Sequence, residues 1–217
     1  MASPASPAAT NMYSQSINKL IETLKKLPSV GERTAERYVF HWLKSGKKEV
    51  TELMLSLKNL IDNVKSCEIC WNFSEQSPCP ICSDKKRDQS TICVVAEPPD
   101  LVAIEHTGTY GGVYHCLREL VDGGDEESID RTKSKELFDR IEQKNKFSKN
   151  VKINEIILAL NPDLTGETTM LYLEREIKLR SPSTKITRLA RGLPLGADLR
   201  YADEITLQSA IKNRTSK

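Results

Sequence analysis

The chain lacks any run of about 18 consecutive apolar residues, the length that a membrane-spanning helix needs. Residues 1–10 are rich in Ala, Ser and Pro and contain neither the basic region nor the apolar core of an export signal. These absences exclude a membrane span and predict a cytoplasmic protein, and we expect residues 1–15 to form a disordered tail. A hydrophobic content of 38% over 217 residues fits a soluble globular protein of one or two domains.

The chain also has little net charge, +2 at pH 7, but that charge is unevenly distributed. Residues 16–65 contain ten Lys and Arg against six acids, residues 95–140 contain five against eleven, and residues 178–217 contain nine against three. Two basic ends therefore flank an acidic middle. This pattern permits contact with nucleic acid at particular faces without requiring it, since charged runs are usually solvated surface.

Four of the six cysteines follow the pattern C-x2-C-x8-C-x2-C, at Cys67, Cys70, Cys79 and Cys82. Two redox dithiols or two disulfides would also fit, but two C-x-x-C units so close together favour a tetrahedral Zn²⁺ site. Four thiolates leave no open coordination position, so we predict a structural zinc. Cys93 and Cys116 remain, and we interpret each as a small buried apolar side chain.

Apolar residues at helical spacing predict three short helices between residues 16 and 65. The first two are joined by the turn at residues 27–31, which has the form of a helix-hairpin-helix. Such a turn presents backbone N–H groups at a helix N-terminus to a DNA phosphate. Arg33 and Arg37 lie one turn apart on the second helix and could follow the backbone. An ordinary αα-hairpin remains the alternative.

After the cysteines, short β-rich runs at residues 91–95, 154–160 and 184–190 alternate with helical stretches around 98–106, 134–144, 167–180 and 202–213. This alternation predicts an α/β domain with a parallel sheet. Residues 107–133 are rich in Gly and acids, and we predict a long irregular excursion there. His115 lies within it without an identifiable catalytic partner, so a structural role is favoured.

Carboxylates follow the first two predicted strands, with Glu97 and Asp100 after one and Asp163 and Glu167 after the other. The carboxyl ends of parallel strands form the usual ligand crevice of such a sheet, where oxygen ligands could hold Mg²⁺. Alternatively these acids cap helices, because Asp100 and Glu167 stand where negative charge suits a helix N-terminus. We favour the capping role.

In this order the motifs resemble the RecR family of bacterial recombination mediators, from about Ser16 to Arg214. Besides the hairpin and the cysteines, the matching blocks are residues 104–108, 112–115, 157–162, 166–169, 187–199 and 201–204. The resemblance implies a mixed α/β chain with a helix-hairpin-helix at 16–65, a four-cysteine zinc finger at 66–90, a Toprim-like domain at 91–186 and a C-terminal oligomerisation segment at 187–217.

The resemblance further implies a ring-like homo-oligomer, dimer or tetramer, that clamps double- or single-stranded DNA without sequence specificity. Such proteins act with RecO-like and sometimes RecF-like partners to load a recombinase onto single strands, so we expect a bacterial, nucleoid-associated protein. Arg33 and Arg37 match DNA-contacting positions, and the weaker candidates for DNA contact are Lys25, Lys26 and Lys44. Glu97, Asp100 and Glu167 mark a partner site or a vestigial Mg²⁺ site.

Two departures from the family pattern bear on catalysis. Ala96 stands where we expect the first Toprim glutamate, and Thr165 replaces a usual glutamate before Gly166. Losing both removes ligands from any metal site. We therefore predict a non-catalytic DNA-binding mediator of recombinational repair. The alternatives are a Mg²⁺-dependent nuclease or primase-like enzyme, and a zinc-stabilised interaction module that does not bind DNA.

Overall fold

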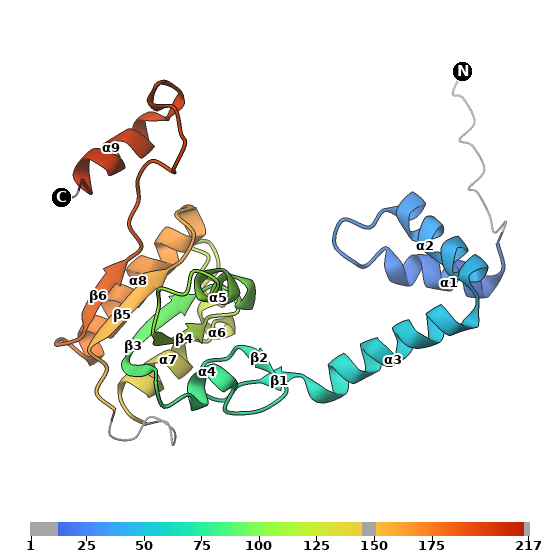
Figure 1. Cartoon of the computed structure of the whole chain (residues 1–217), viewed down its shortest axis with the longest axis horizontal. Coiled ribbons are helices and arrows are strands. Elements are labelled where there is room, and N and C mark those ends of the chain that lie inside the picture. The colour runs from blue at the N-terminus through green and yellow to red at the C-terminus, as the bar shows by residue number, and fades with distance from the viewer. Residues whose placement is uncertain (1–12, 145–150, 215–217) are drawn as a thin grey trace. The chain divides into compact units, whose positions relative to one another are not determined.

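The computed structural model describes residues 13–144 and 151–214 and divides into two compact units, residues 1–63 and 64–217 (Figure 1). Residues 1–12 of the expected tail lie outside the described residues, and Gln15 already belongs to the first helix. In the described residues, no helix is both long enough and apolar enough to cross a membrane.

The N-terminal unit consists of α1 (Gln15–Leu24), α2 (Glu32–Ser45) and α3 (Lys47–Asn63). Helices α1 and α2 pack around a small buried cluster of Ile21, Ala35 and Val39. Ser29, in the turn between them, has φ +62°, a left-handed conformation that glycine adopts more readily. The three predicted helices are thus present, and the turn takes the hairpin geometry despite its serine.

No side chain of α3 is buried, although its apolar residues recur at helical spacing. The exposed members are Leu53, Leu57, Leu60 and Ile61. A helix with an apolar face normally buries that face, so α3 presents a surface that the described residues of its own unit do not cover.

The second unit begins with a short region that contains the four spaced cysteines, residues 65–83, which we call the knuckle. It continues into an α/β domain. Its elements are β1 (Lys65–Ser66), β2 (Phe73–Ser74), α4 (Pro80–Ser83), β3 (Asp88–Val95), α5 (Pro98–Glu105), β4 (Gly112–Cys116), α6 (Ser128–Arg131), α7 (Ser134–Ile141), β5 (Glu155–Ala159), α8 (Leu164–Arg180), β6 (Lys185–Arg188), the 3₁₀ turn η1 (Leu199–Tyr201) and α9 (Glu204–Lys212).

The sheet is parallel throughout, with strand order β4-β3-β5-β6. Side chains of α7 and α8 pack on one face against residues such as Ile92 and Ile156. On the other face, Leu101 of α5 packs with Cys93 and Cys116. Both cysteines are buried as predicted, and burial raises the pKa of each thiol to about 12. The predicted α/β class with a parallel sheet is confirmed.

The prediction of an irregular excursion over residues 107–133 is wrong in its first part, because β4 lies there beside β3. All five residues of β4 are buried, so the strand lacks the polar–apolar alternation that marks a half-exposed strand. It also starts at Gly112, where a side chain would collide with the Tyr110 ring and the Thr91 carbonyl oxygen. A buried strand that starts on such a glycine does not look like a strand in sequence.

Candidate metal centre and nucleic-acid interface

The four knuckle cysteines converge on one point. Their sulfur atoms all lie within 4.8 Å of one another, and all four residues are buried. The Sγ atoms of Cys70 and Cys79 are 3.6 Å apart, and the Cys79 amide donates to the Cys67 sulfur at 3.3 Å. Amide donors of this kind favour the thiolate form of a sulfur.

The donor set fits Zn²⁺. Four thiolates in a closed, buried cluster form the ligand set of a structural zinc site with no open position. Hydrogen bonding from Cys70 lowers the pKa of Cys67, and hydrogen bonding to Cys67 raises the pKa of Cys82. Cys67, Cys70, Cys79 and Cys82 would hold Zn²⁺ as four thiolates, a state in which this competition for protons would no longer exist. The prediction of a four-cysteine zinc site is supported by this geometry.

The knuckle is fixed to the end of β4 through Arg118. The Arg118 Nε donates to the Trp71 carbonyl oxygen at 2.6 Å, and Nη2 donates to Ser66 Oγ at 2.9 Å. The guanidinium also lies 3.5 Å from the centre of the Phe73 ring. A backbone bond from Cys116 N to Cys70 O, 2.8 Å, completes the attachment. No sequence pattern indicates the role of Arg118, because its partners are 47 and 52 residues away.

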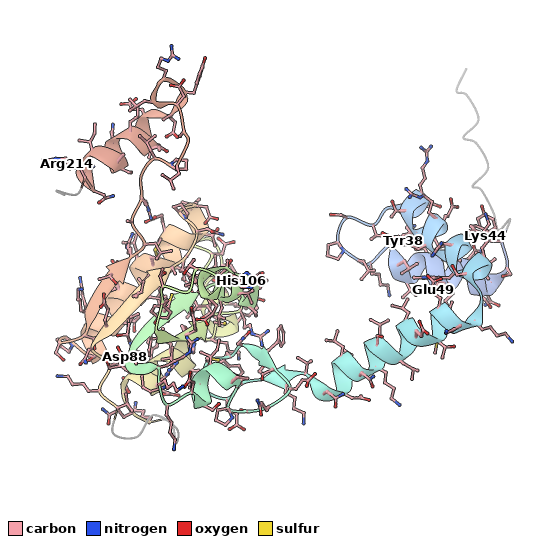
Figure 2. The ribbon with its side chains drawn as sticks, in the orientation of Figure 1. Tyr38, Lys44, Glu49, Asp88, His106 and Arg214 are labelled. Atoms are coloured by element: carbon pink, nitrogen blue, oxygen red, sulfur yellow. The ribbon has the colours of Figure 1, made fainter. Side chains whose placement is uncertain are left out.

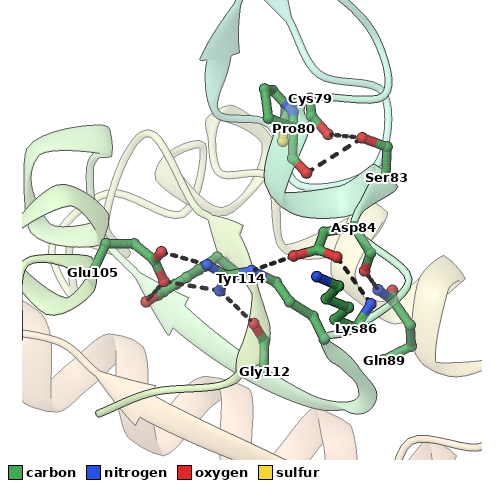
Figure 3. A network of polar contacts seen from close by, with 10 residues as sticks. Cys79, Pro80, Ser83, Asp84, Lys86, Gln89, Glu105, Gly112 and Tyr114 are labelled. Carbon is green, nitrogen blue, oxygen red and sulfur yellow. Dashed lines mark hydrogen bonds and ion pairs between the residues drawn. The ribbon is translucent and has the colours of Figure 1, made fainter. Parts of the chain in front are cut away.

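A second polar network ties the segment after the knuckle to the sheet (Figure 3). Arg87 donates from Nη1 and Nη2 to the two Glu105 oxygens, at 2.9 and 2.5 Å, and from Nη1 to the Gly112 carbonyl oxygen at 3.0 Å. The Tyr114 hydroxyl donates to the same carboxylate at 2.6 Å. The Arg87 hydrogen bond is the main cause of the lowered Glu105 pKa.

We expect Glu105→Gln to destabilise the protein by about 1 to 2 kcal/mol at neutral pH, because the bidentate charge-assisted pair is lost. The folded-state pKa of Glu105 is lowered, so its contribution is complete above the usual carboxyl pKa of 4.5 and is lost as the pH falls through the lower folded value. Urea unfolding of variant and wild type should therefore differ at pH 7 and converge in acid.

The matched control for Glu105→Gln is Glu119→Gln. Glu119 pairs with Arg131 at 2.9 Å, but both side chains are about half exposed. Exposed pairs contribute little, so this variant should stay close to wild type. An equal loss in the two variants, or a Glu105 effect that persists in acid, would contradict the assigned role.

Two buried side chains, His115 and Arg140, connect β4 to neighbouring segments through hydrogen bonds with backbone carbonyl oxygens. His115 is buried, its Nε2 lies 2.7 Å from the Lys133 carbonyl oxygen, and burial lowers its pKa to about 3. Arg140 is also buried, and its Nη1 donates to the Tyr114 carbonyl oxygen at 2.8 Å. The imidazole is therefore neutral and engaged with backbone, which agrees with the structural role that we favoured for it.

The three acids of the predicted Mg²⁺ or partner site are engaged in two separate local arrangements. Glu97 and Asp100 form a capping box at the start of α5, with the Glu97 amide donating to Asp100 Oδ2 at 2.9 Å. Glu167 accepts from Arg191 and from Arg188, and the Arg191 hydrogen bond is the first cause of its lowered pKa.

Across residues 13–144 and 151–214, the cysteines form the only set of three or more His, Cys, Asp or Glu side chains placed to hold a metal. Glu97, Asp100 and Glu167 are not brought together as such a set. Asp163, the remaining acid, caps α8 by accepting from Gly166 N at 2.7 Å. The helix-capping interpretation therefore describes Glu97, Asp100 and Asp163, while Glu167 serves an arginine cluster.

The basic candidates of the hairpin lie on α2 and in the turn before it. Arg33, Arg37 and Lys44 belong to α2, are exposed and form no ion pair with any described residue. Lys26 likewise has no acidic partner in the described chain. Lys25 differs, because its Nζ pairs with Glu22 at 2.8 Å. Arg33 and Arg37, in the first half of α2, and Lys44, in its last turn, are therefore exposed cations without an ion-pair partner in the described chain.

Four family models match successive parts of the chain. Family models match residues 17–61 (RecR, helix-hairpin-helix), 64–84 (RecR, zinc finger domain with four cysteines), 90–190 (Toprim domain) and 192–215 (RecR, C-terminal). The chain thus has the domain content of a zinc-finger, Toprim-containing recombination protein.

Curated relatives are similar to this chain over nearly its whole length. A protein from Moorella thermoacetica is 41% identical over 93% of this chain and 97% of its own, and one from Gloeobacter violaceus is 40% identical over 94% and 98%. A third, from Staphylococcus aureus, is 39% identical over 94% and 98%. All three are named recombination protein RecR. The chain belongs to the RecR family, as its motifs predicted.

Proposed function

We propose that this protein is a non-catalytic mediator of recombinational repair that binds DNA through its helix-hairpin-helix. The observation that carries the proposal is the set of exposed, unpaired cations at the start of α2, with Arg33 and Arg37 one turn apart. Phosphate contacts from arginines and a helix N-terminus give affinity without sequence specificity. The partners are double- and single-stranded DNA.

The proposed mechanism is electrostatic and depends on several copies of the chain. Each hairpin neutralises few phosphates, so one subunit binds weakly and its affinity falls steeply with salt. A homo-oligomer, dimer or tetramer, that clamps DNA multiplies these weak sites by avidity. The exposed apolar residues of α3, together with Ile205 and Ile211 of α9, supply surfaces that such an assembly could bury.

The clamp is proposed to act with a RecO-like protein, and in some settings a RecF-like one, to load recombinase onto single-stranded DNA. We place it in the bacterial cytoplasm at the nucleoid. The zinc is structural in this scheme, and Mg²⁺ has no part in it. Helix capping by Glu97 and Asp100 and the arginine pairs of Glu167 support the absence of strand cleavage.

The decisive experiment is fluorescence anisotropy of labelled single- and double-stranded DNA at low and moderate salt. Arg33→Glu/Arg37→Glu should weaken binding roughly ten- to hundredfold and flatten the salt dependence, because two phosphate contacts are reversed in sign. The matched control is Lys135→Glu/Lys152→Glu, which reverses two exposed lysines outside the hairpin and should leave the affinity nearly unchanged. A folded wild type that does not bind DNA at low salt would overturn the proposal. Mg²⁺-dependent nicking that disappears in Glu97→Gln would establish the enzyme instead.

A further inference from the structure

One charged side chain lies inside the second unit. Charged residues such as Lys44 and Arg214 are exposed (Figure 2), whereas Arg140 of α7 is only 2% exposed. Among the described residues it is the only Lys, Arg, Asp or Glu that is buried. A buried charge is costly unless an opposite charge compensates it. Arg140 therefore needs a negative partner.

No carboxylate of the described chain is that partner. Arg140 forms no ion pair with a described residue, and the hydrogen bond that it donates there runs from Nη1 to the Tyr114 carbonyl oxygen at 2.8 Å. A carbonyl oxygen compensates only part of a full charge. His115, the buried residue beside Tyr114, is neutral, because burial lowers its pKa to about 3. The counter-charge of the guanidinium therefore comes from another group.

The knuckle lies at the same edge of β4 as the Arg140 guanidinium. In the described sheet β4 is an edge strand and pairs with β3 alone. The Cys116 amide points away from β3 and donates to the Cys70 carbonyl oxygen of the knuckle at 2.8 Å. Alternate residues of a parallel strand direct their backbone groups to the same side, so the Tyr114 carbonyl oxygen also points to this edge. The guanidinium bound to that oxygen lies at the edge that the knuckle covers.

The negative group at this edge is the set of four cysteines. As ligands of Zn²⁺, Cys67, Cys70, Cys79 and Cys82 leave two negative charges that the metal does not neutralise. Burial lowers the pKa of Arg140, and the charges of Cys82 and Cys70 act in the opposite direction, as anions close to a guanidinium do. The buried cation and the buried cluster therefore have complementary charges within reach of each other.

We infer that Arg140 is the buried counter-ion of the four-cysteine zinc site and tunes the affinity of that site for its metal. Without the metal the thiols are neutral and the guanidinium has no buried counter-charge. Without the guanidinium the thiolates keep negative charge that only the metal offsets. Arg140 belongs to α7, which holds no zinc ligand, so this pair couples metal binding in the knuckle to the α/β domain. The inference goes beyond the proposed function, and no DNA enters its test.

The test compares Arg140→Met, which keeps a long unbranched side chain without the charge, with Arg140→Lys, which keeps the charge. Competition of the full chain with a chromogenic chelator measures zinc affinity. We expect the affinity to fall roughly ten- to hundredfold in Arg140→Met and to stay near wild type in Arg140→Lys. With Co²⁺ in the site, the thiolate-to-metal charge-transfer band should move to lower energy in Arg140→Met, because thiolates without a nearby cation give up electron density more readily. A merely structural role would not move that band.

Ile141→Val is the matched control, because it shortens a buried side chain of the same helix and changes no charge. This variant should leave the zinc affinity and the cobalt band unchanged. Wild-type affinity and band position in Arg140→Met would overturn the inference. A lysine variant that binds zinc as weakly as the methionine variant would overturn it as well, because charge would then not be the cause.

A second measurement applies if Arg140→Met does not fold. Removing zinc from the wild type leaves the guanidinium without its counter-charge, so the amides of α7 should lose protection from hydrogen exchange. The amides of α8, whose side chains pack on the same face of the sheet, should keep theirs. Unchanged protection of α7, or an equal loss in α7 and α8, would overturn the inference.

Discussion

Cys79→Ser is expected to abolish stoichiometric zinc binding and to unfold the knuckle. Each of the four sulfurs is a required ligand in a closed site, and metal binding to such sites contributes on the order of 10 kcal/mol to folding. Regular structure within the knuckle is short, since β1 and β2 are two residues each and α4 is four, so the contacts of Arg118 are the main support left without the metal. Zinc content by atomic emission and thermal unfolding with and without a chelator would measure both effects.

The control for this variant is Cys93→Ser, which changes the same atom at a buried site in the sheet away from the metal cluster. That variant should lose some stability but retain one zinc per chain. Retention of full zinc content in Cys79→Ser, or an unchanged melting temperature on chelation of the wild type, would contradict a structural zinc held by four cysteines.

Gly166→Ala is expected to cost about 3 kcal/mol or more, among the largest effects available from one methyl group. A side chain at residue 166 would overlap the Asn161 carbonyl oxygen and lie 3.1 Å from the carbonyl carbon and from Asp163 Oδ1. These are mostly backbone atoms, which cannot move aside as a side chain does. The first turn of α8 must therefore shift from the end of β5. Urea unfolding would measure the loss.

Gly123→Ala is the matched control, because its added carbon would meet only the Thr168 Cγ2 at 3.7 Å, an ordinary contact. We expect it to change stability by less than about 0.5 kcal/mol. Similar stabilities for the two variants would show that the loop at residues 161–166 accommodates a side chain, which would contradict the close approach.

The elements that the sequence predicted are those determined by local patterns. Cysteine spacing identified the metal centre, and helical periodicity identified the three N-terminal helices. The β-rich runs before Glu97 and before Asn161 correspond to β3 and β5. In each of these elements, the residues that specify it are neighbours in sequence, so their local spacing is enough to predict it.

What the sequence did not predict depends on contacts between distant segments. Arg118 adopts φ +70° and reaches the knuckle across about fifty residues, and no spacing rule marks it. The contacts of Glu167 depend on Arg188 and Arg191, which follow it by 21 and 24 residues in the sequence. The hypothesis of a shared acidic site treated the carboxylates alone, whereas cations and helix N-termini competing for them determine where they point.

The arginine pairs of Glu167 have a consequence for how salt acts on this protein. Arg191 lies in the C-terminal segment, and its carbonyl oxygen accepts from Asn213 Nδ2 at 3.1 Å, so one residue links the ion pair to the end of the last helix, α9. Arg191 and Glu167 are 41% and 33% exposed, so dissolved ions screen their attraction. Raising the salt concentration therefore weakens the anchorage of the C-terminal segment, in addition to any effect of salt on the proposed phosphate contacts of Arg33 and Arg37. A salt titration would thus change the protein itself and not only its contacts with a charged partner.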